Sequence, residues 1–388
     1  MLLLDLPLET LSAIIYNLGN GKNDNGVTVR VVQTLRDVRL VCKALSAPAT
    51  RRLFATAHLL PGIESVQKWE SLLADTKLSA LFRGVIIDTF PDKNWTSENG
   101  DPDLGEFEAP EEWEEAIGRL PELPGLEGVH LRFSQDCAVD QPGRWWGKEV
   151  PETTARRQEI LELVFKAMAD ANANAVAAGE GSRRVRSLTI QHLQNVVQDE
   201  LVESEDFKSV LAGLEELHVS VCTEYDDAAP ECSLEKAEVR TFWPRFTQKW
   251  LQPLAPRLRA LSIYGDTLWG VIPTWDSRAL HFPKLKSLAL GNYTLAYDWQ
   301  VDWLAKHETL QSLSLDDCPI AHYFRVDDAY AKRDLETNDL IDLGRGGGGR
   351  VQKWGNSLRW DFVFSRLQSS LPALVDFRPG HGAWEEVR

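Results

Sequence analysis

A short apolar pattern, with leucine or another apolar residue at the first, fourth and sixth positions, recurs along the chain. Within each copy apolar side chains alternate with small or polar ones, which is typical of a short β-strand with one face in the core. The clear copies span residues 126–131, 185–190, 214–219, 258–263, 285–290 and 310–315. Residues 82–87 form a plausible earlier copy, and Leu371, Leu374 and Phe377 a weaker late one. The pattern predicts a series of strands from residue 82 onward.

Helical patterns lie between these strands. The clearest runs through Leu161, Val164, Phe165 and Met168, where apolar residues recur at the spacing of one helix face. Residues 360–371 repeat this pattern. Strands and helices are therefore expected to alternate along most of the chain.

Alternating units that cannot bury their apolar faces alone predict a stacked solenoid. Three steps between successive copies are about 25 to 29 residues long, within or at the edge of the length of a leucine-rich repeat, and the longer steps can hold an insertion. We expect residues 61–388 to form an irregular leucine-rich-repeat-like α/β solenoid, with an ordinary α/β domain as the alternative. An acidic, solvated insertion is expected at about 91–115, and a flexible Gly-rich loop at 344–350.

The first 60 residues have a different pattern. Apolar residues at helical spacing predict one helix that opens near Leu6 and ends at Gly19, and a second between Leu35 and Leu45. A third helix is expected just after the second. We therefore predict that residues 1–60 form a compact helical bundle.

This N-terminal segment resembles the F-box. The resemblance is carried by Leu6-Pro7-Leu8-Glu9, by Ile14 and Leu18, and by Leu40-Val41-Cys42-Lys43. Residues 49–59 are similar to the segment that closes this motif in fungal F-box proteins. In that family the helices dock on a small Skp-type adaptor, and leucine-rich repeats downstream often hold the substrate. The adaptor contacts that the resemblance implies are Leu6, Pro7, Leu8, Ile14, Leu18, Leu40, Val41 and Cys42.

The resemblance implies a substrate-recruiting, non-catalytic subunit of an SCF-type cullin-RING ubiquitin ligase. Its partners would be the Skp-type adaptor and a protein substrate that the sequence does not identify. The alternative is a leucine-rich-repeat interaction scaffold in which the N-terminal helices only cap the first repeat, because a solenoid has to cover its apolar ends. An enzyme with its site in the irregular insertions is a third alternative.

Composition narrows the classes of partner. The 388 residues include 42 Lys and Arg against 58 Asp and Glu, and the formal net charge of −16 argues against nucleic acids and anionic membranes. No apolar stretch approaches the roughly 20 residues that cross a bilayer. The five Cys include no Cys-x-x-Cys pair and fit neither a disulfide framework nor a zinc ribbon. We therefore expect a cytoplasmic and/or nuclear protein.

Signatures of catalysis are absent from the sequence, which has no nucleophile elbow, no phosphate-binding loop and no His-Glu-x-x-His motif. The eight His include no pair at helical spacing, so neither a metal nor another cofactor is expected. Cys222 and Cys318 follow repeat strands at the position where leucine-rich repeats place an Asn or Cys that bonds to neighbouring backbone. We interpret both as structural residues.

Side chains between the repeat leucines point to the opposite face of each strand, which in a solenoid is the concave sheet. The early strands carry there the hydrogen-bonding and aromatic side chains that recur at protein-binding hot spots. The candidate substrate-binding residues are His130, Arg132, Gln191, His218 and Tyr264. This register predicts that Leu217 and Leu261 are buried and that His218 and Tyr264 are exposed. The alternative is that loops and insertions bind the partner.

Overall fold

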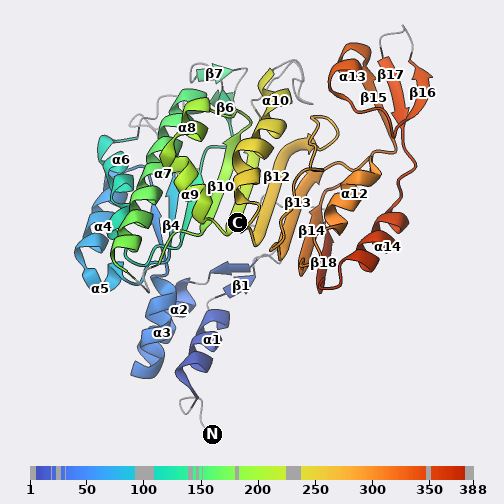
Figure 1. The fold of residues 1–388 in the computed structure, drawn as a ribbon. Coiled ribbons are helices and arrows are strands. Elements are labelled where there is room, and N and C mark those ends of the chain that lie inside the picture. The colour runs from blue at the N-terminus through green and yellow to red at the C-terminus, as the bar shows by residue number, and fades with distance from the viewer. Residues whose placement is uncertain are drawn as a thin grey trace.

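One parallel sheet runs through the fold. A computed structural model describes residues 6–18, 20–22, 28–30, 32–91, 109–138, 143–145, 148–150, 152–179, 183–223, 237–346 and 351–380. From one edge to the other, the nine strands are β3 (Thr56–Leu59), β4 (Gly84–Asp88), β5 (Gly128–Arg132), β10 (Ser187–Gln194), β11 (Glu216–Cys222), β12 (Ala260–Trp269), β13 (Ser287–Tyr293), β14 (Ser312–Asp316) and β18 (Asp376–Gly380). Their order in the sheet follows their order in the chain (Figure 1). The predicted α/β class is confirmed.

The repeat positions line up across this sheet. Leu217 of β11 pairs in register with Leu188 of β10 and with Leu261 of β12. All six clear copies of the pattern run into strands of the sheet, as does the copy at residues 82–87. Leu217 and Leu261 are 0% exposed, which confirms the predicted register. The leucines thus face one side of the sheet and the side chains between them face the other.

The two edge strands differ from the prediction. Ala57 of β3 pairs with Val85 of β4, so the sheet begins inside residues 1–60, which were predicted to be a helical bundle. At the other edge Phe377 pairs with Leu313, so the last copy lies later than the one predicted from Leu371. Alanine and phenylalanine stand here where leucine stands in other copies, so the apolar pattern is weakest at the edges.

Helices cover the leucine side of the sheet (Figure 1). The main ones are α4 (Ile63–Ala74), α6 (Glu111–Gly118), α7 (Thr154–Ala177), α8 (Asp199–Glu203), α9 (Glu205–Gly213), α10 (Ala237–Phe246), α12 (Asp298–Ala305) and α14 (Trp360–Ser370), with the short α5 (Thr76–Ser79) and α11 (Gln252–Leu254). The longest helix, α7, buries Leu161, Val164, Phe165 and Met168, as their spacing predicts. Their burial confirms this helical prediction.

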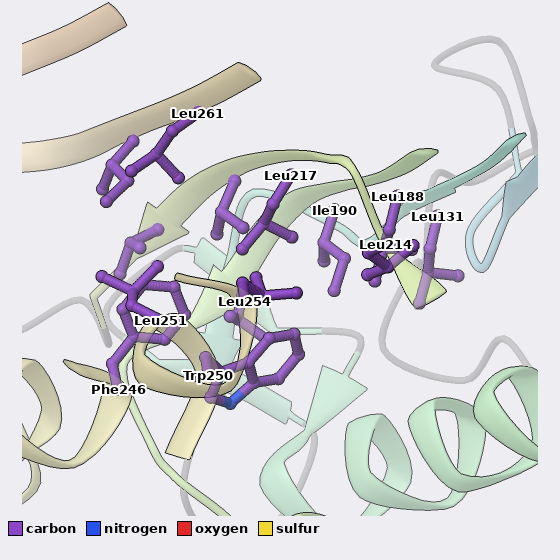
Figure 2. Packing of buried hydrophobic residues seen from close by; sticks show 14 of the residues in the cluster. Leu131, Leu188, Ile190, Leu214, Leu217, Phe246, Trp250, Leu251, Leu254 and Leu261 are labelled. Carbon is purple, nitrogen blue, oxygen red and sulfur yellow. The ribbon is translucent and has the colours of Figure 1, made fainter. Parts of the chain in front are cut away.

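A continuous apolar core fills the space between the sheet and the helices. Figure 2 shows Leu217 and Leu261 of the sheet facing Phe246 and Trp250 of the helical layer. The Trp250 ring also packs edge-on against Phe207, with ring centroids 4.9 Å apart. Large rings of this kind fill the uneven gaps between helices and strands. The core therefore holds the strands in place from one side only.

The predicted acidic insertion at 91–115 is wrong at its C-terminal end. Residues 111–118 form α6, in which Trp113 and Ile117 are 0% exposed and belong to the main core. The two side chains lie one turn apart on the same helix face, while the acidic residues occupy the first turn, where the helix dipole favours negative charge. Apolar spacing outweighs acidic composition here. Residues 92–108 lie outside the described part of the chain.

The predicted Gly-rich loop at 344–350 differs from the structure at its N-terminal end. Gly344 and Arg345 belong to β16 (Ile341–Arg345), which pairs antiparallel with β17 (Val351–Gly355). β17 also pairs with β15 (Tyr323–Asp327), and α13 (Asp328–Asp334) packs beside this small sheet. Residues 347–350 lie outside the described part of the chain. Strand pairing thus continues through Gly344 and Arg345, although glycine has no side chain to pack.

The N-terminal helices form a separate unit beside the sheet (Figure 1). They are α1 (Leu8–Leu18), α2 (Val32–Val41) and α3 (Lys43–Leu53), with a hairpin of β1 (Asn20–Lys22) and β2 (Thr28–Arg30) between the first two. Both α1 and α2 pack against α3. Their own small core consists of Leu11, Ile15, Leu35, Leu45 and Ala49.

Candidate partner-binding surfaces

The N-terminal helices carry large apolar side chains on their surface. Leu40 is 86% exposed, Val41 68% and Leu18 50%. Pro7 is also exposed, whereas Leu6, Ile14 and Cys42 are half-buried. The side chain of Leu8 lies outside the described part of the structure. None of the seven described residues with predicted adaptor contacts belongs to the fully buried core of the bundle.

A ring contact joins this bundle to the sheet, and Arg39 supports it from within the bundle. The guanidinium of Arg39 lies over the ring of Phe54, 5.5 Å from its centroid, and its Nε donates to Thr50 Oγ1 at 3.0 Å. Phe54 in turn packs edge-on against Phe82, two residues before β4, with ring centroids 6.4 Å apart. The contact between Phe54 and Phe82 therefore links the bundle to the main core.

A second candidate surface is the face of the sheet opposite the leucines. One row of side chains crosses it from strand to strand and consists of His130, Thr189, His218, Ser262, Ala289, Ser314 and Arg378. Together with Gln191, Ser220, Tyr264 and neighbouring residues, this row lines a hollow of about 480 Å³. We call this space the sheet hollow. Of the five predicted substrate-binding residues, all except Arg132 line it.

Two imidazoles in the sheet hollow are uncharged at neutral pH. Burial, and after it the charge of Arg132, lowers the pKa of His130 to about 4. Burial also lowers the pKa of His218, whose Nδ1 lies 2.8 Å from Ser262 Oγ. Since neither histidine gains a proton near pH 7, both present neutral hydrogen-bonding edges to the hollow.

Tyr264 lies flat across the sheet. A methyl group added at Gly291 of the next strand would lie only 2.0 Å from Cδ1 of this ring. The phenol shares a hydrogen bond with Ser314, and burial together with the charge of Asp316 raises the pKa of Tyr264 to about 12. His218 and Tyr264 are therefore half-buried, which corrects the prediction that both are exposed. The cause is close packing along the sheet face, since the register itself is right.

Arg132 is engaged within the protein. Its Nη2 donates to Asp88 Oδ2 at 2.7 Å and lies 2.8 Å from His58 Nε2. Although burial alone would raise the pKa of Asp88, hydrogen bonds from His58 and Arg132 hold it below the ordinary value. These side chains link β3, β4 and β5 at the edge of the sheet. Arg132 is thus a bridge between strands, and its predicted role in substrate binding has no support from its position.

A fully buried charged cluster lies at the ends of β10 and β11. Arg157, 1% exposed, pairs with Glu152 Oε2 at 2.9 Å and donates to the backbone oxygens of Ser134 and His192, each at 2.6 Å. Sequence reasoning missed it because its members come from separate segments of the chain. The partners of its two Nη atoms explain how this charge can be buried, although Nε has no partner among the described residues. The cluster does not line the sheet hollow, and we interpret its role as structural, because it ties together separate segments of the chain.

Cysteine side chains at the repeat turns bond as predicted. Cys222 Sγ donates to His192 O at 3.1 Å, and Cys318 Sγ to Leu290 O at 3.3 Å, so each reaches the backbone of the preceding strand. The Sγ atom of Cys222 also lies 3.1 Å from Arg157 Nη1 and 3.6 Å from Cys137 Sγ. Both residues thus have the structural role that their position in the pattern indicates.

Neither a metal centre nor a membrane span is found within the described ranges. These residues contain no cluster of three or more His, Cys, Asp or Glu that could bind a metal ion. The helices among them are also too short or too polar to cross a membrane. No model of a known protein family matches the chain, and no curated protein matches it. The function is therefore inferred from the two surfaces.

Proposed function

We propose that the protein is the substrate-recruiting adaptor subunit of an SCF-type cullin-RING ubiquitin ligase. In this proposal the N-terminal helices are an F-box-like bundle that docks on the Skp-type adaptor. The sheet and its helices are an irregular leucine-rich-repeat-like solenoid that holds a protein substrate. The chain contributes proximity, since it keeps a target lysine at high effective concentration near the activated ubiquitin.

The observation that carries the proposal is the division of apolar residues in the N-terminal bundle. Among the described residues that resemble the F-box contacts, Leu6 and Cys42 pack against the small core of the bundle, whereas Leu18 is half exposed and Leu40 and Val41 are largely exposed. Burying one such side chain contributes about 1.5 to 3 kcal/mol, so a partner that covered several of them would gain a substantial part of its binding energy. Exposed apolar groups of this kind typically mark a contact with another protein.

The parallel sheet supports the repeat part of the proposal. Successive strands keep the same register, and each row of leucines is covered by neighbouring units and the helical layer. In solenoids each unit contacts only its neighbours and leaves a continuous sheet face for partners. The bonds of Cys222 and Cys318 to the backbone of the preceding strand also fit this architecture.

The runner-up, a scaffold whose helices are only a cap, is less well supported. A cap is expected to turn its apolar residues onto the first repeat. Here Leu11, Ile15 and Leu35 fill a core of the bundle itself, while Leu40 and Val41 face solvent. A cap does not need exposed apolar residues such as Leu40 and Val41, and these two residues belong to the segment that resembles the F-box.

Binding of the purified Skp-type adaptor to the full chain tests the proposal. Val41→Asp should weaken binding at least tenfold, because it places a carboxylate in a desolvated contact that offers it no partner. Val375→Asp is the matched control, since Val375 is 88% exposed but belongs to the opposite edge of the sheet. Both variants should keep the wild-type melting temperature. Failure of the wild type to bind, or equal affinity of Val41→Asp, would refute adaptor docking.

A further inference from the structure

The C-terminal edge of the sheet is open on its apolar side. Among the described residues, β18 pairs with β14 alone and is the last strand of the sheet (Figure 1). Val375, directly before it, is 88% exposed, and Phe364 of α14 is 43% exposed. A groove of about 490 Å³ beside α14 and β18 is lined chiefly by apolar side chains, among them Leu367, Leu374 and Phe377. Because a solenoid needs a polar cap at its end, an apolar end of this kind is suited to a partner.

The backbone of β18 has hydrogen-bonding groups that face this open edge. The N–H of Asp376 donates to the carbonyl oxygen of Gln311 at 3.1 Å. The carbonyl oxygen of Gly380 accepts from the N–H of Asp317, also at 3.1 Å. Because alternate residues of a strand direct these groups to the same neighbour, Phe377 points its own N–H and carbonyl away from β14. β18 can therefore pair with one more strand.

The charges of β18 are complementary to those of a second copy. In an antiparallel pair with its two-fold axis at Phe377, this residue exchanges both backbone hydrogen bonds with Phe377 of the second copy. Asp376 and Arg378, which form an ion pair within the strand at 2.7 Å, then lie opposite Arg378 and Asp376 of the second copy. The four charges alternate in sign, which stabilises a pair of strands. A shift of the axis by one residue would place two Asp or two Arg opposite each other, so the charges favour this register.

Apolar side chains meet on the other face of this pair. Phe377 and Pro379 lie on the leucine side of β18, because they pair in register with leucines of β14. In the register centred on Phe377, the exposed Val375 lies opposite Pro379 of the second copy, which lines the groove. The two Phe377 side chains lie opposite each other. Each copy thus covers apolar surface that the other exposes.

Pro379 limits the strength of this contact. It has no N–H to donate to the facing strand, and proline is typical of edge strands for this reason. The strand pair therefore relies chiefly on the two hydrogen bonds of Phe377. We expect a reversible dimer with a dissociation constant in the micromolar range.

We propose that the protein forms a two-fold dimer through β18, in which antiparallel pairing centred on Phe377 joins the two sheets. The grooves beside α14 are covered in the same contact. β3, which follows α3 of the N-terminal bundle, is the strand at the opposite edge of the sheet. The dimer therefore leaves Leu40 and Val41 uncovered and presents two sheet hollows. The inference does not depend on adaptor docking.

Sedimentation velocity of the full chain tests this inference. Between about 1 and about 200 µM protein the wild type should change from monomer toward dimer, in about 0.15 M salt to screen the net charge of −16. Asp376→Arg places four arginines in the contact and Arg378→Asp four aspartates, so each variant alone should weaken dimerisation at least tenfold. Circular dichroism should show that both variants keep the wild-type fold, because the two side chains are on the surface.

Combination of the two changes should restore the dimer. In an equimolar mixture of the Asp376→Arg and Arg378→Asp proteins each arginine faces an aspartate, so a mixed dimer should form. The double variant Asp376→Arg/Arg378→Asp exchanges the charges and should dimerise like the wild type. Glu64→Arg is the matched control, since Glu64 forms an exposed ion pair with Lys68 on α4, and it should leave dimerisation unchanged.

A wild type that stays monomeric over this range would overturn the inference and leave the edge to another protein chain. A dimer that neither single variant weakens would overturn it too, as would a mixture and a double variant that both stay monomeric. If a variant that ends at Gly380 dimerises and the full chain does not, residues 381–388 occupy the edge and the inference is wrong.

Adaptor binding and melting are measured well below the dissociation constant of the dimer, so Val375→Asp remains a valid control there. A protein that binds the adaptor but does not dimerise refutes only this inference. A protein that dimerises but does not bind the adaptor refutes only the docking proposal.

Discussion

The contact between Gly291 and Tyr264 gives the sharpest stability prediction. A methyl group on Gly291 would lie 2.0 Å from Cδ1 and 2.4 Å from Cε1 of the tyrosine ring. Carbon atoms in contact lie about 3.5 to 4.0 Å apart, so in Gly291→Ala the ring has to move by about 1.5 Å or swing off the sheet. Gly291 does not have a left-handed backbone, so the clash is the only steric penalty.

Two opposing effects determine the size of the change. Overpacking of this kind costs about 1 to 3 kcal/mol, whereas replacing glycine by alanine stabilises by about 0.4 to 1 kcal/mol through the unfolded chain. The overpacking cost is larger, so Gly291→Ala should lower the free energy of unfolding by roughly 1 to 2 kcal/mol. Urea unfolding followed by circular dichroism measures this directly, with an unchanged m-value as the check on two-state behaviour.

A double-mutant cycle isolates the contact. In a Tyr264→Ala background the ring is gone, so adding Gly291→Ala should be neutral or slightly stabilising. The coupling energy between the two positions should be about 1 to 3 kcal/mol. If Gly291→Ala is as stable as the wild type in the presence of Tyr264, the ring does not lie where the structure places it.

Three further predictions concern the buried groups, each measured as a free energy of unfolding. Trp113→Ala should destabilise by about 3 to 5 kcal/mol, and Glu112→Ala, in the same acidic run, by less than about 0.5 kcal/mol; equal effects would contradict the packing of α6. Because burial lowers the pKa of His130 to about 4, the unfolded chain takes up a proton first, so stability should fall as the pH drops from about 7 to 4; His130→Gln should make this slope shallower but not abolish it, since the pKa values of His218 and His307 are also lowered. Arg157→Met should cost about 3 to 5 kcal/mol by leaving Glu152 buried and unpaired, and Arg157→Met with Glu152→Gln should cost less; an equal or larger cost for the pair would argue against the buried ion pair.

The strands of the sheet could be predicted because their signal is local. Alternation within six residues determines which side chains share a face, and Leu217 and Leu261 are buried as this alternation requires. The two edge strands were not predicted correctly, because Ala57 and Phe377 occupy positions that hold leucine in most other strands. The helix at Trp113 was not predicted, because its dense acidic charge is typical of a solvated insertion and only the one-turn spacing of Trp113 and Ile117 indicates a buried face.

The candidate site was predictable in position but not in detail. Side-chain direction followed from the strand register, and so His130, Gln191, His218 and Tyr264 line one hollow. Their burial depends on which groups lie beside them, which a single sequence does not show. Arg132 is an example, because its partner His58 lies on β3, a strand that the apolar pattern does not predict.

Packed rings join the two surfaces, and this matters for the proposed function. Arg39 of the bundle lies over Phe54, and Phe54 packs against Phe82 at the edge of the main core, so the connection is made by packed rings as well as by the chain itself. A flexible tether would let a bound substrate sample many positions and would lower the effective concentration of any one lysine near the ubiquitin donor. A joint that stays packed in solution would instead keep the hollow at a constant distance from the exposed residues Leu40 and Val41. If the chain both docks on the adaptor and holds a substrate in the hollow, the geometry of this joint selects which lysine of the substrate is within reach.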